Sequence, residues 1–189
     1  MTTMRSQIDL LGQRIAMLIE RLRNMGYVFE DPTQVFPGPE TETETIIEKI
    51  EREVGEIPEA LKLFWRQVGS VNLTGHHPSW TETEYCPDQL IVYPASYALY
   101  YFEDEHGNRL AYDKPFQIII APDELHKANV SGGAPYSISI PAVANDPPLN
   151  ASPVTETFLE HIDRSLKSGG FPGLEGDQDH NWPIAKLRC

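Results

Sequence analysis

The spacing of apolar residues changes at Gly69, and this change limits the folds that the chain can adopt. Before Gly69 these residues recur every three or four positions, which is typical of amphipathic helices. After Gly69 they form short runs rich in β-branched and aromatic residues, separated by turn-forming residues, which is typical of strands. A helical spacing returns near residue 154. We therefore predict an α+β fold in which a layer of helices covers a sheet.

Four segments carry the helical spacing, at residues 8–25, 41–54, 58–68 and 152–168. Thr41 and Glu44 are spaced as a capping box for the second helix. Ser152 and Pro153 fit the N-cap and the first position of the fourth helix. We expect the fourth helix to bury Val154, Phe158, Leu159, Ile162 and Leu166.

The third of these helices has the clearest pattern. Pro58 fits its first turn, because proline lacks the N–H that a helix start leaves unpaired. Trp65 lies in its apolar stripe, and Gly69 supplies its C-terminal stop. We expect Pro58, Trp65 and Gly69 to have structural roles.

Five runs predict strands, at residues 90–93, 97–103, 109–112, 116–121 and 136–140. In the last run apolar residues alternate with Ser137 and Ser139, which predicts one face on the core and one toward water. This pattern favours an antiparallel or partly mixed sheet of about five or six strands. The sequence at residues 106–108 supplies the positive-φ residues of a tight hairpin between the second and third strands.

The second run is rich in aromatic residues. Strand alternation would place Tyr97, Leu99 and Tyr101 on one face of the sheet, and Tyr100 and Phe102 on the other. One set would belong to the core and the other would be partly exposed, where tyrosines make good interface anchors. Burial of both sets beneath helices is the alternative.

The composition divides the chain into four segments. They are an N-terminal amphipathic helix at residues 1–29, a connector at 30–40, an α+β domain at 41–173 and a C-terminal tail at 174–189. The apolar seam of the first helix has coiled-coil spacing but is shorter than the run of heptads that a coiled coil requires. We favour packing of this helix on its own domain, and a weak dimer through the seam is the alternative.

The chain carries 15 basic and 28 acidic residues, a formal net charge of -13. Binding of nucleic acid needs clustered Lys and Arg, so no nucleic-acid partner is predicted. An acidic chain attracts a basic partner, and the alternative is that the charge serves only solubility. The two cysteines, Cys86 and Cys189, form no disulfide framework. The sequence shows neither an export signal nor a membrane span, so we expect a cytoplasmic protein without membrane association.

Two groups of residues are candidates for catalysis. His76 and His77 precede Cys86 by about ten residues, and Asp123 lies near His126. Neither group has the spacing of a zinc motif, and no nucleophile accompanies Asp123 and His126. We therefore predict no catalytic residues, no metal and no cofactor, and keep a small metal-dependent hydrolase as an alternative.

One stretch of the chain points to a known family. Residues 57–65, with the sequence IPEALKLFW, are followed by Gly69, a meander of strands and a closing helix, and this order resembles the SUKH superfamily. That superfamily includes bacterial toxin-immunity proteins and fungal cell-wall-synthesis regulators. The resemblance spans residues 41–173 and is also seen at 90–94, 121–123, 126–133 and 169–173. Val68 departs from the pattern, since many members carry a polar residue there.

The resemblance implies an α+β fold with an antiparallel sheet and a helical layer. It also implies no catalytic machinery and a protein partner, commonly a toxin domain. Several such toxins are nucleases, which tend to be basic, so the acidic charge of this chain fits the implication.

The leading hypothesis is a non-catalytic immunity protein that neutralises a toxin domain by covering it, with acidic residues at the rim and aromatic residues nearer the centre. A dimerising regulatory scaffold is a further alternative. The candidate partner-binding residues lie in predicted loops or turns: Trp80, Glu82, Glu84, Tyr85, Glu103, Asp104, Glu105, Asp123 and Glu124.

Overall fold

The structure is a computed structural model that describes residues 3–81, 83, 86–107, 115–175 and 180–189, without the side chains of residues 105–107. The fold is α+β, as predicted. The described helices are α1 (Met4–Met25), α2 (Thr43–Val54), α3 (Glu59–Gln67), α4 (Ala95–Gly107), α5 (Glu124–Lys127), α6 (Phe158–Lys167) and α7 (Ile184–Leu187), with a 3₁₀ turn at Pro172–Leu174. The described strands are β1 (Val28–Phe29), β2 (Val71–Asn72), β3 (Gly75–His76), β4 (Ile91–Val92), β5 (Phe116–Ala121) and β6 (Tyr136–Ile140).

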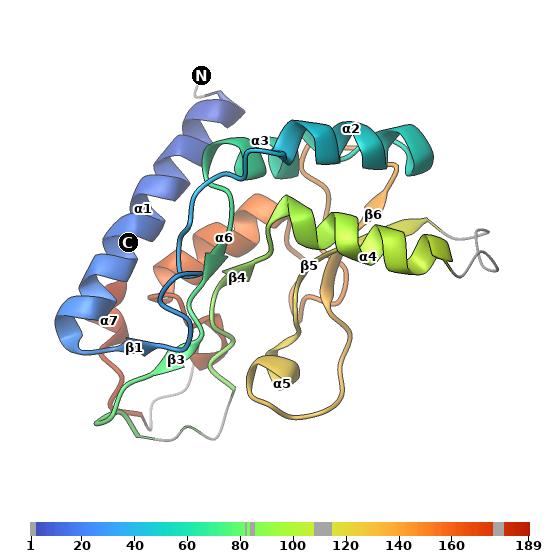
Figure 1. Cartoon of the computed structure of the whole chain (residues 1–189). Helices are drawn as coiled ribbons and strands as arrows, with labels where there is room; N and C mark the ends of the chain where they lie inside the picture. The colour runs from blue at the N-terminus through green and yellow to red at the C-terminus, as the bar shows by residue number, and fades with distance from the viewer. Residues whose placement is uncertain (1–2, 82, 84–85, 108–114, 176–179) are drawn as a thin grey trace.

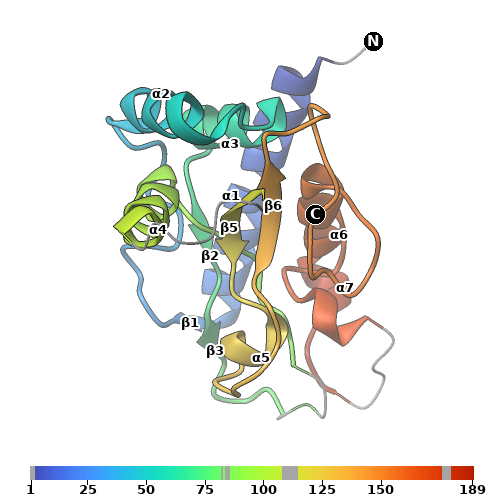
Figure 2. The same ribbon diagram turned by 90° about the vertical axis from the view of Figure 1, so that its right-hand side faces the viewer.

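The helices surround the strands. In Figure 1, α2 and α3 lie across the top of the molecule and α1 runs down one side. Figure 2 shows α4 and α6 on opposite sides of β5 and β6. Within the described part of the chain, no helix combines the length and apolar character that a membrane crossing requires.

The strands form three antiparallel pairs, β1 with β3, β2 with β4, and β5 with β6. The prediction of one sheet with about five or six strands is therefore wrong for the described residues. A backbone hydrogen bond of 2.8 Å from Tyr93 N to Ile120 O joins β4 to β5 outside these pairs. The longest pair, β5 and β6, matches the predicted runs at 116–121 and 136–140 residue for residue.

Residues 97–103 belong to helix α4, so the strand predicted for them is wrong. Ala95, Ala98 and Phe102 recur at helical spacing and are at most 4% exposed. Strand alternation placed Tyr100 and Phe102 on the same face, but the helix separates them and leaves Tyr100 66% exposed. The predicted hairpin is lost with this strand, and residues 109–112 lie outside the described part of the chain.

A carboxylate from the connector fixes the start of α4. Glu40 accepts hydrogen bonds from the backbone N of Ser96 at 2.9 Å and from its hydroxyl at 2.5 Å. The helix then packs against α2 and β5. Aromatic residues favour strands only through the packing that they find there, and here the helical packing prevails.

Helix α2 begins without the predicted capping box. Its N-cap is Glu42, whose side chain makes no capping hydrogen bond. Thr41 instead donates to the Glu42 carboxylate at 2.7 Å, and Glu44 pairs with Arg66 of α3. The apolar stripe of the helix is nevertheless buried.

Helix α6 begins five residues after the predicted proline position. Thr157 is its N-cap, and Thr157 and Glu160 form a complete capping box. Val154 therefore lies outside the helix and is 46% exposed, contrary to the prediction. The other four residues of the predicted stripe are buried.

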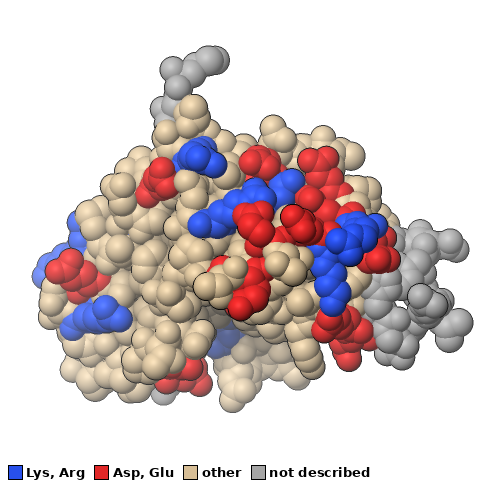
Figure 3. Space-filling model, turned by 45° about the horizontal axis from the view of Figure 1, so that its top comes forward, with Lys and Arg blue, Asp and Glu red and all other residues tan. Residues whose placement is uncertain are grey.

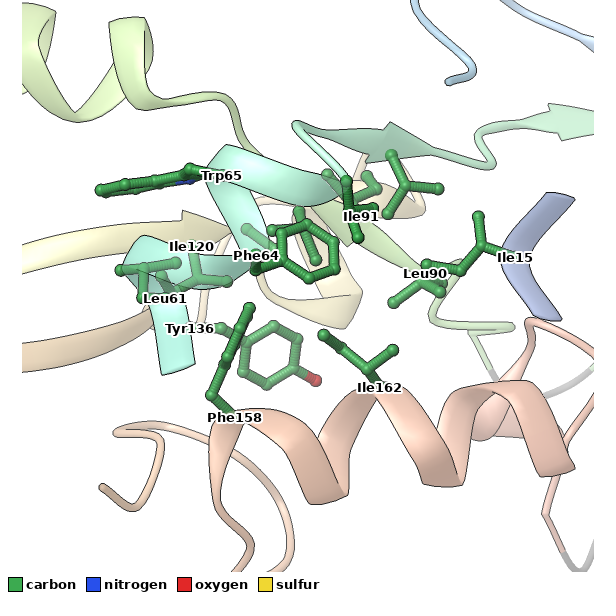
Figure 4. Close-up of a cluster of buried hydrophobic side chains, with 14 of the residues drawn as sticks. Ile15, Leu61, Phe64, Trp65, Leu90, Ile91, Ile120, Tyr136, Phe158 and Ile162 are labelled. Carbon is green, nitrogen blue, oxygen red and sulfur yellow. The ribbon is translucent and has the colours of Figure 1, made fainter. Parts of the chain in front are cut away.

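The centre of the core forms around α3. Phe64 and Trp65 are at most 1% exposed, and Figure 4 shows them among side chains from the strands and α6. The ring of Phe64 packs edge-on against Phe158 of α6, with centroids 5.4 Å apart. Trp65 donates from Nε1 to the carbonyl of Tyr93 at 3.0 Å, which ties α3 to the chain that follows β4.

The ends of α3 follow from its flanking residues. Pro58 is the buried N-cap, one residue before the first helical position. Val68 is the C-cap, and Gly69 follows it with φ +86°. A side chain at Gly69 would overlap the carbonyl of Gly38, so this position requires glycine for both its conformation and its packing.

Helix α1 packs inside the same core. Its seam residues Ile8, Leu11, Ile15, Leu18 and Leu22 are at most 3% exposed, and the helix packs against α3, α6 and α7. Other helices of the same chain therefore cover the seam. Arg14 fastens the helix by donating to Asp163 of α6 and to the carbonyl of Cys189, each at 2.6 Å.

Candidate binding site

A strongly charged surface covers α2 and α4, which run side by side in Figures 1 and 2. Residues 40–66 hold eight acidic and four basic residues, and α4 holds three acidic residues and no basic one. Figure 3 shows charged side chains crowded together on this side of the molecule. We call the exposed surface of α2 and α4 the acidic face.

Ion pairs neutralise part of the charge on the acidic face. Arg66 donates from Nε at 2.6 Å and from Nη2 at 2.8 Å to the two carboxylate oxygens of Glu44. These hydrogen bonds lower the pKa of Glu44. Lys49 of α2 pairs with Glu103 of α4 and so bridges the two helices.

Three exposed acids of the acidic face have no ion-pair or hydrogen-bond partner among the described residues. They are Glu48 and Glu53 on α2 and Asp104 on α4. Carboxylates in water keep their charge and their hydration, and they lose little when a cation approaches. These three groups are available to a positively charged partner.

Tyr100 adds aromatic area to the acidic face. It lies three and four residues before Glu103 and Asp104, so the three side chains share one side of α4. The ring of Tyr100 lies 6.4 Å from that of Tyr97, which in turn lies 4.0 Å from that of Tyr93. Burial, followed by the contact with Tyr97, raises the pKa of Tyr93 to about 12. Tyr100 is therefore backed by a row of packed tyrosines.

The predicted contact residues fall in different places. Glu103 and Asp104 are exposed on the acidic face, in a helix instead of the predicted turn. Glu105 belongs to the same helix, but its side chain lies outside the description. Trp80 lies in the loop after β3, which Figure 1 places away from α4. The predicted residues Glu82, Glu84 and Tyr85 lie outside the described residues.

Asp123 uses its carboxylate inside the protein. It is 3% exposed, caps α5 by accepting from the backbone N of Leu125 at 3.0 Å and of His126 at 3.2 Å, and pairs with the His126 ring. Burial raises the pKa of Asp123, but the hydrogen bonds from His126 and Leu125 outweigh it and lower the pKa. Asp123 therefore offers no free carboxylate to a partner.

Glu124 belongs to a buried polar group that we call the Lys127 cluster, made of Asp88, Glu124, Lys127 and Tyr136. The Lys127 side chain is 0% exposed, and its Nζ lies 2.5 Å from Oδ1 of Asp88. The Tyr136 hydroxyl donates to Oδ2 of Asp88 at 3.0 Å and lies 3.3 Å from Oε2 of Glu124. Burial lowers the pKa of Lys127 and raises the pKa of Tyr136, because a low-polarity environment disfavours the charged forms.

A second buried polar group extends from Tyr136 into α6. The ring of His161 lies 5.1 Å from the ring of Tyr136, and its Nδ1 lies 2.7 Å from Oε1 of Glu156. Arg164 donates two hydrogen bonds to the same carboxylate, at 2.8 and 2.9 Å. Burial raises the pKa of Glu156, but Arg164 and His161 outweigh it and lower the pKa to about 2. Together the two groups tie α5, β6 and α6 to one another.

The groups considered for catalysis are also used structurally. His77 donates from Nε2 to the carbonyl of Met25 at 2.8 Å, because its Nδ1 accepts from the backbone N of Ser79 at 3.1 Å. Burial and nearby acidic groups raise the pKa of the Cys86 thiol, which disfavours a nucleophilic thiolate. Among the described residues, no group of three or more His, Cys, Asp or Glu side chains could hold a metal ion.

Comparison with known proteins identifies no relative of the chain. No protein-family model, curated protein or solved structure matches the chain. The SUKH resemblance is therefore carried by the sequence motifs alone.

Sequence reasoning missed Glu48 and Glu53 as candidate contact residues, and it considered Tyr100 only as one of the strand tyrosines that could be exposed. The signal was present, since Tyr100, Glu103 and Asp104 have the i, i+3, i+4 spacing of one helix side. Assigning residues 97–103 to a strand concealed it, because strand alternation places Glu103 and Asp104 on opposite faces.

Proposed function

We propose that this chain is a non-catalytic binding protein whose acidic face covers a basic protein partner. The observation that carries the proposal is the combination, on adjacent helices, of the exposed ring of Tyr100 with three exposed carboxylates that have no partner among the described residues. In line with the SUKH resemblance, the partner is a toxin domain and the chain is its immunity protein.

In this proposal, the negative charge of the chain speeds its encounter with the partner and selects basic partners over acidic ones. The net charge of -13 attracts a basic domain from a distance, and like-charged proteins are rejected. Charged groups at an interface chiefly raise the association rate, and salt screens them over about 8 Å at physiological ionic strength. A basic nuclease domain fits this requirement.

Tyr100 supplies contact energy. Tyrosine is enriched among the residues that dominate binding, because its large ring carries a hydrogen-bonding tip. Glu103 and Asp104 lie one turn away and are more polar, so the surface has an apolar centre and a charged rim. The packed tyrosines behind Tyr100 limit the ordering cost of binding.

The proposed mechanism is occupancy. The chain blocks its partner by covering it, and no bond is made or broken. The buried polar groups around Lys127 and Glu156 serve this function only indirectly, by holding the helices and strands in one arrangement.

Co-expression with a toxin domain encoded beside the gene tests the proposal. We expect the chain to restore growth of cells that produce the toxin domain and to co-purify with it. Failure of both growth rescue and co-purification would contradict the proposal.

Truncation of the aromatic anchor then tests the assigned surface. Tyr100→Ala should weaken the complex by about tenfold or more, as is typical of a central aromatic residue. Leu10→Ala is the matched control, because Leu10 is 54% exposed and belongs to α1, which is not part of the acidic face. Equal affinities for the two variants would place the interface elsewhere.

A further inference from the structure

A hollow lined by aromatic side chains lies away from the acidic face, between the loop after β3 and the C-terminal segment. Its volume is about 400 Å³, and its lining includes His77, Trp80, Cys86, Gln89 and Trp182. We call it the tryptophan pocket. Of the described residues of α2 and α4, none lines the pocket, so it is separate from the acidic face.

The aromatic wall of the pocket is fixed before any ligand arrives. The rings of Trp80 and Trp182 have centroids 4.8 Å apart, and the ring of Trp80 stacks on that of His77 at 4.6 Å with an interplanar angle of 14°. Trp182 donates from Nε1 to the carbonyl of Thr81 at 2.8 Å. His77 is held by the carbonyl of Met25. A preformed wall lowers the ordering cost of binding.

Gln89 supplies an unused acceptor on the lining of this pocket. Gln89 is 8% exposed, and its Oε1 is buried without a hydrogen-bond partner among the described residues. A buried carbonyl oxygen without a donor is unfavourable, so a ligand N–H that reaches it gains a hydrogen bond at little cost.

The electrostatic environment of the pocket favours a cation. The pKa of Cys86, on the pocket wall, is raised first by burial and then by the charges of Glu124, Asp88 and Asp123. Lys127 pairs with Asp88 and the His126 ring pairs with Asp123, so Glu124 is the one of these three acids without an ion pair among the described residues. A positively charged ligand is therefore favoured over a neutral one.

We propose that the tryptophan pocket binds the guanidinium group of an arginine side chain on the protein partner. The planar cation stacks on an indole ring and donates from its N–H groups to Oε1 of Gln89. The ammonium group of a lysine side chain is more strongly hydrated and stacks less well than a guanidinium group. An uncharged side chain gains nothing from the carboxylates near the pocket. The inference deepens the proposed function and rests on it, because only a basic partner presents such side chains.

The test uses N-acetyl-arginine amide as the probe and the full-length chain labelled with ¹⁵N. The indole N–H resonances of Trp80 and Trp182 should shift as the probe is added, with a Kd of about millimolar. The resonance of Trp65 should stay in place, because that side chain is 1% exposed in the core. N-acetyl-lysine amide should bind at least about threefold more weakly. N-acetyl-norleucine amide, of similar length and without charge, should leave the resonances unchanged.

Shifts of the Trp80 and Trp182 resonances that are tightest with the arginine probe, weaker with the lysine probe and absent with the norleucine probe support the proposal. No shift with the arginine probe, or equal shifts with the norleucine probe, would overturn it. Because this series uses the unaltered protein, the result is independent of whether any variant folds. The probe contains no partner, so a negative result leaves the acidic face to be judged by co-expression.

A pair of variants tests the role of Gln89. Gln89→Ala should weaken binding of the arginine probe about three- to tenfold, which is the effect of losing one hydrogen bond. Gln67→Ala is the matched control, because Oε1 of Gln67 is also buried without a partner but lies outside the pocket. If folded Gln89→Ala binds the arginine probe as tightly as the unaltered protein does, Gln89 is not part of the binding site.

Discussion

The acidic face and the Lys127 cluster use charged side chains in opposite ways. On the acidic face, Glu48 and Glu53 are exposed and have no partner among the described residues. In the Lys127 cluster, Asp88 and Lys127 are at most 3% exposed in their side chains and lie 2.5 Å apart. Water and salt screen the exposed carboxylates of Glu48 and Glu53. Asp88 and Lys127 have lost their hydration, so each of these charges is stabilised by the other. The comparison teaches that stability depends on the buried charges and recognition on the exposed ones.

The largest effect is expected from removing one half of the buried pair. Lys127→Met should lower the free energy of unfolding by about 3–5 kcal/mol, because the Asp88 carboxylate stays buried without its cation. Urea unfolding followed by circular dichroism measures the loss.

The control for this change lies on the acidic face. Lys49→Met removes the ion pair with Glu103, whose side chains are 45% and 55% exposed. The loss should be below about 1 kcal/mol. Similar losses of unfolding free energy for Lys127→Met and Lys49→Met would contradict the distinction between buried and exposed charges.

The second effect is a dependence of stability on pH that arises from Glu156. Its pKa is about 2 in the folded protein and 4.5 ordinarily, so the stabilisation is present above pH 4.5 and is lost as the pH falls toward 2. The difference corresponds to about 3 kcal/mol. The free energy of unfolding should therefore fall between pH 5 and pH 3, and Glu156→Gln should lack this part of the decline. Parallel pH curves for the two proteins would contradict the assignment.

A smaller effect is expected where an ion pair has good geometry but remains exposed. Arg66→Gln removes the two hydrogen bonds to Glu44 on the acidic face. The expected loss of unfolding free energy is about 0–1 kcal/mol. Because Arg66 and Glu44 have the geometry of a strong pair, a loss near that of Lys127→Met would show that geometry matters more than burial.

The parts of the fold that follow from local patterns were predictable. The alternation at residues 136–140 marked β6, and the three- and four-residue spacing marked α1 and α3. Residues 97–103 were not predictable in the same way, because tyrosine and phenylalanine favour strands while Glu40 and the packing on α2 make this segment helical.

The candidate site was predictable only in part. Glu103 and Asp104 are exposed, although in a helix and not in the predicted turn, whereas Asp123 was chosen for the same reason and is buried. The sequence cannot distinguish these cases by composition. Lys127 meets Asp88 across 39 residues of chain, and such pairings are decided by tertiary packing.

The most direct test of the acidic face is the association rate with the partner recovered by co-expression, measured by stopped flow at low and at physiological salt. One variant carries Glu48→Lys, Glu53→Lys and Asp104→Lys. A matched variant with the same change in net charge carries Asp9→Lys, Glu20→Lys and Glu30→Lys, all at exposed positions of α1 or just beyond β1. At low salt the first variant should associate at least about tenfold more slowly than the unaltered chain, and the second should change by less than about twofold. Equal slowing by both variants would contradict the assignment of recognition to the acidic face.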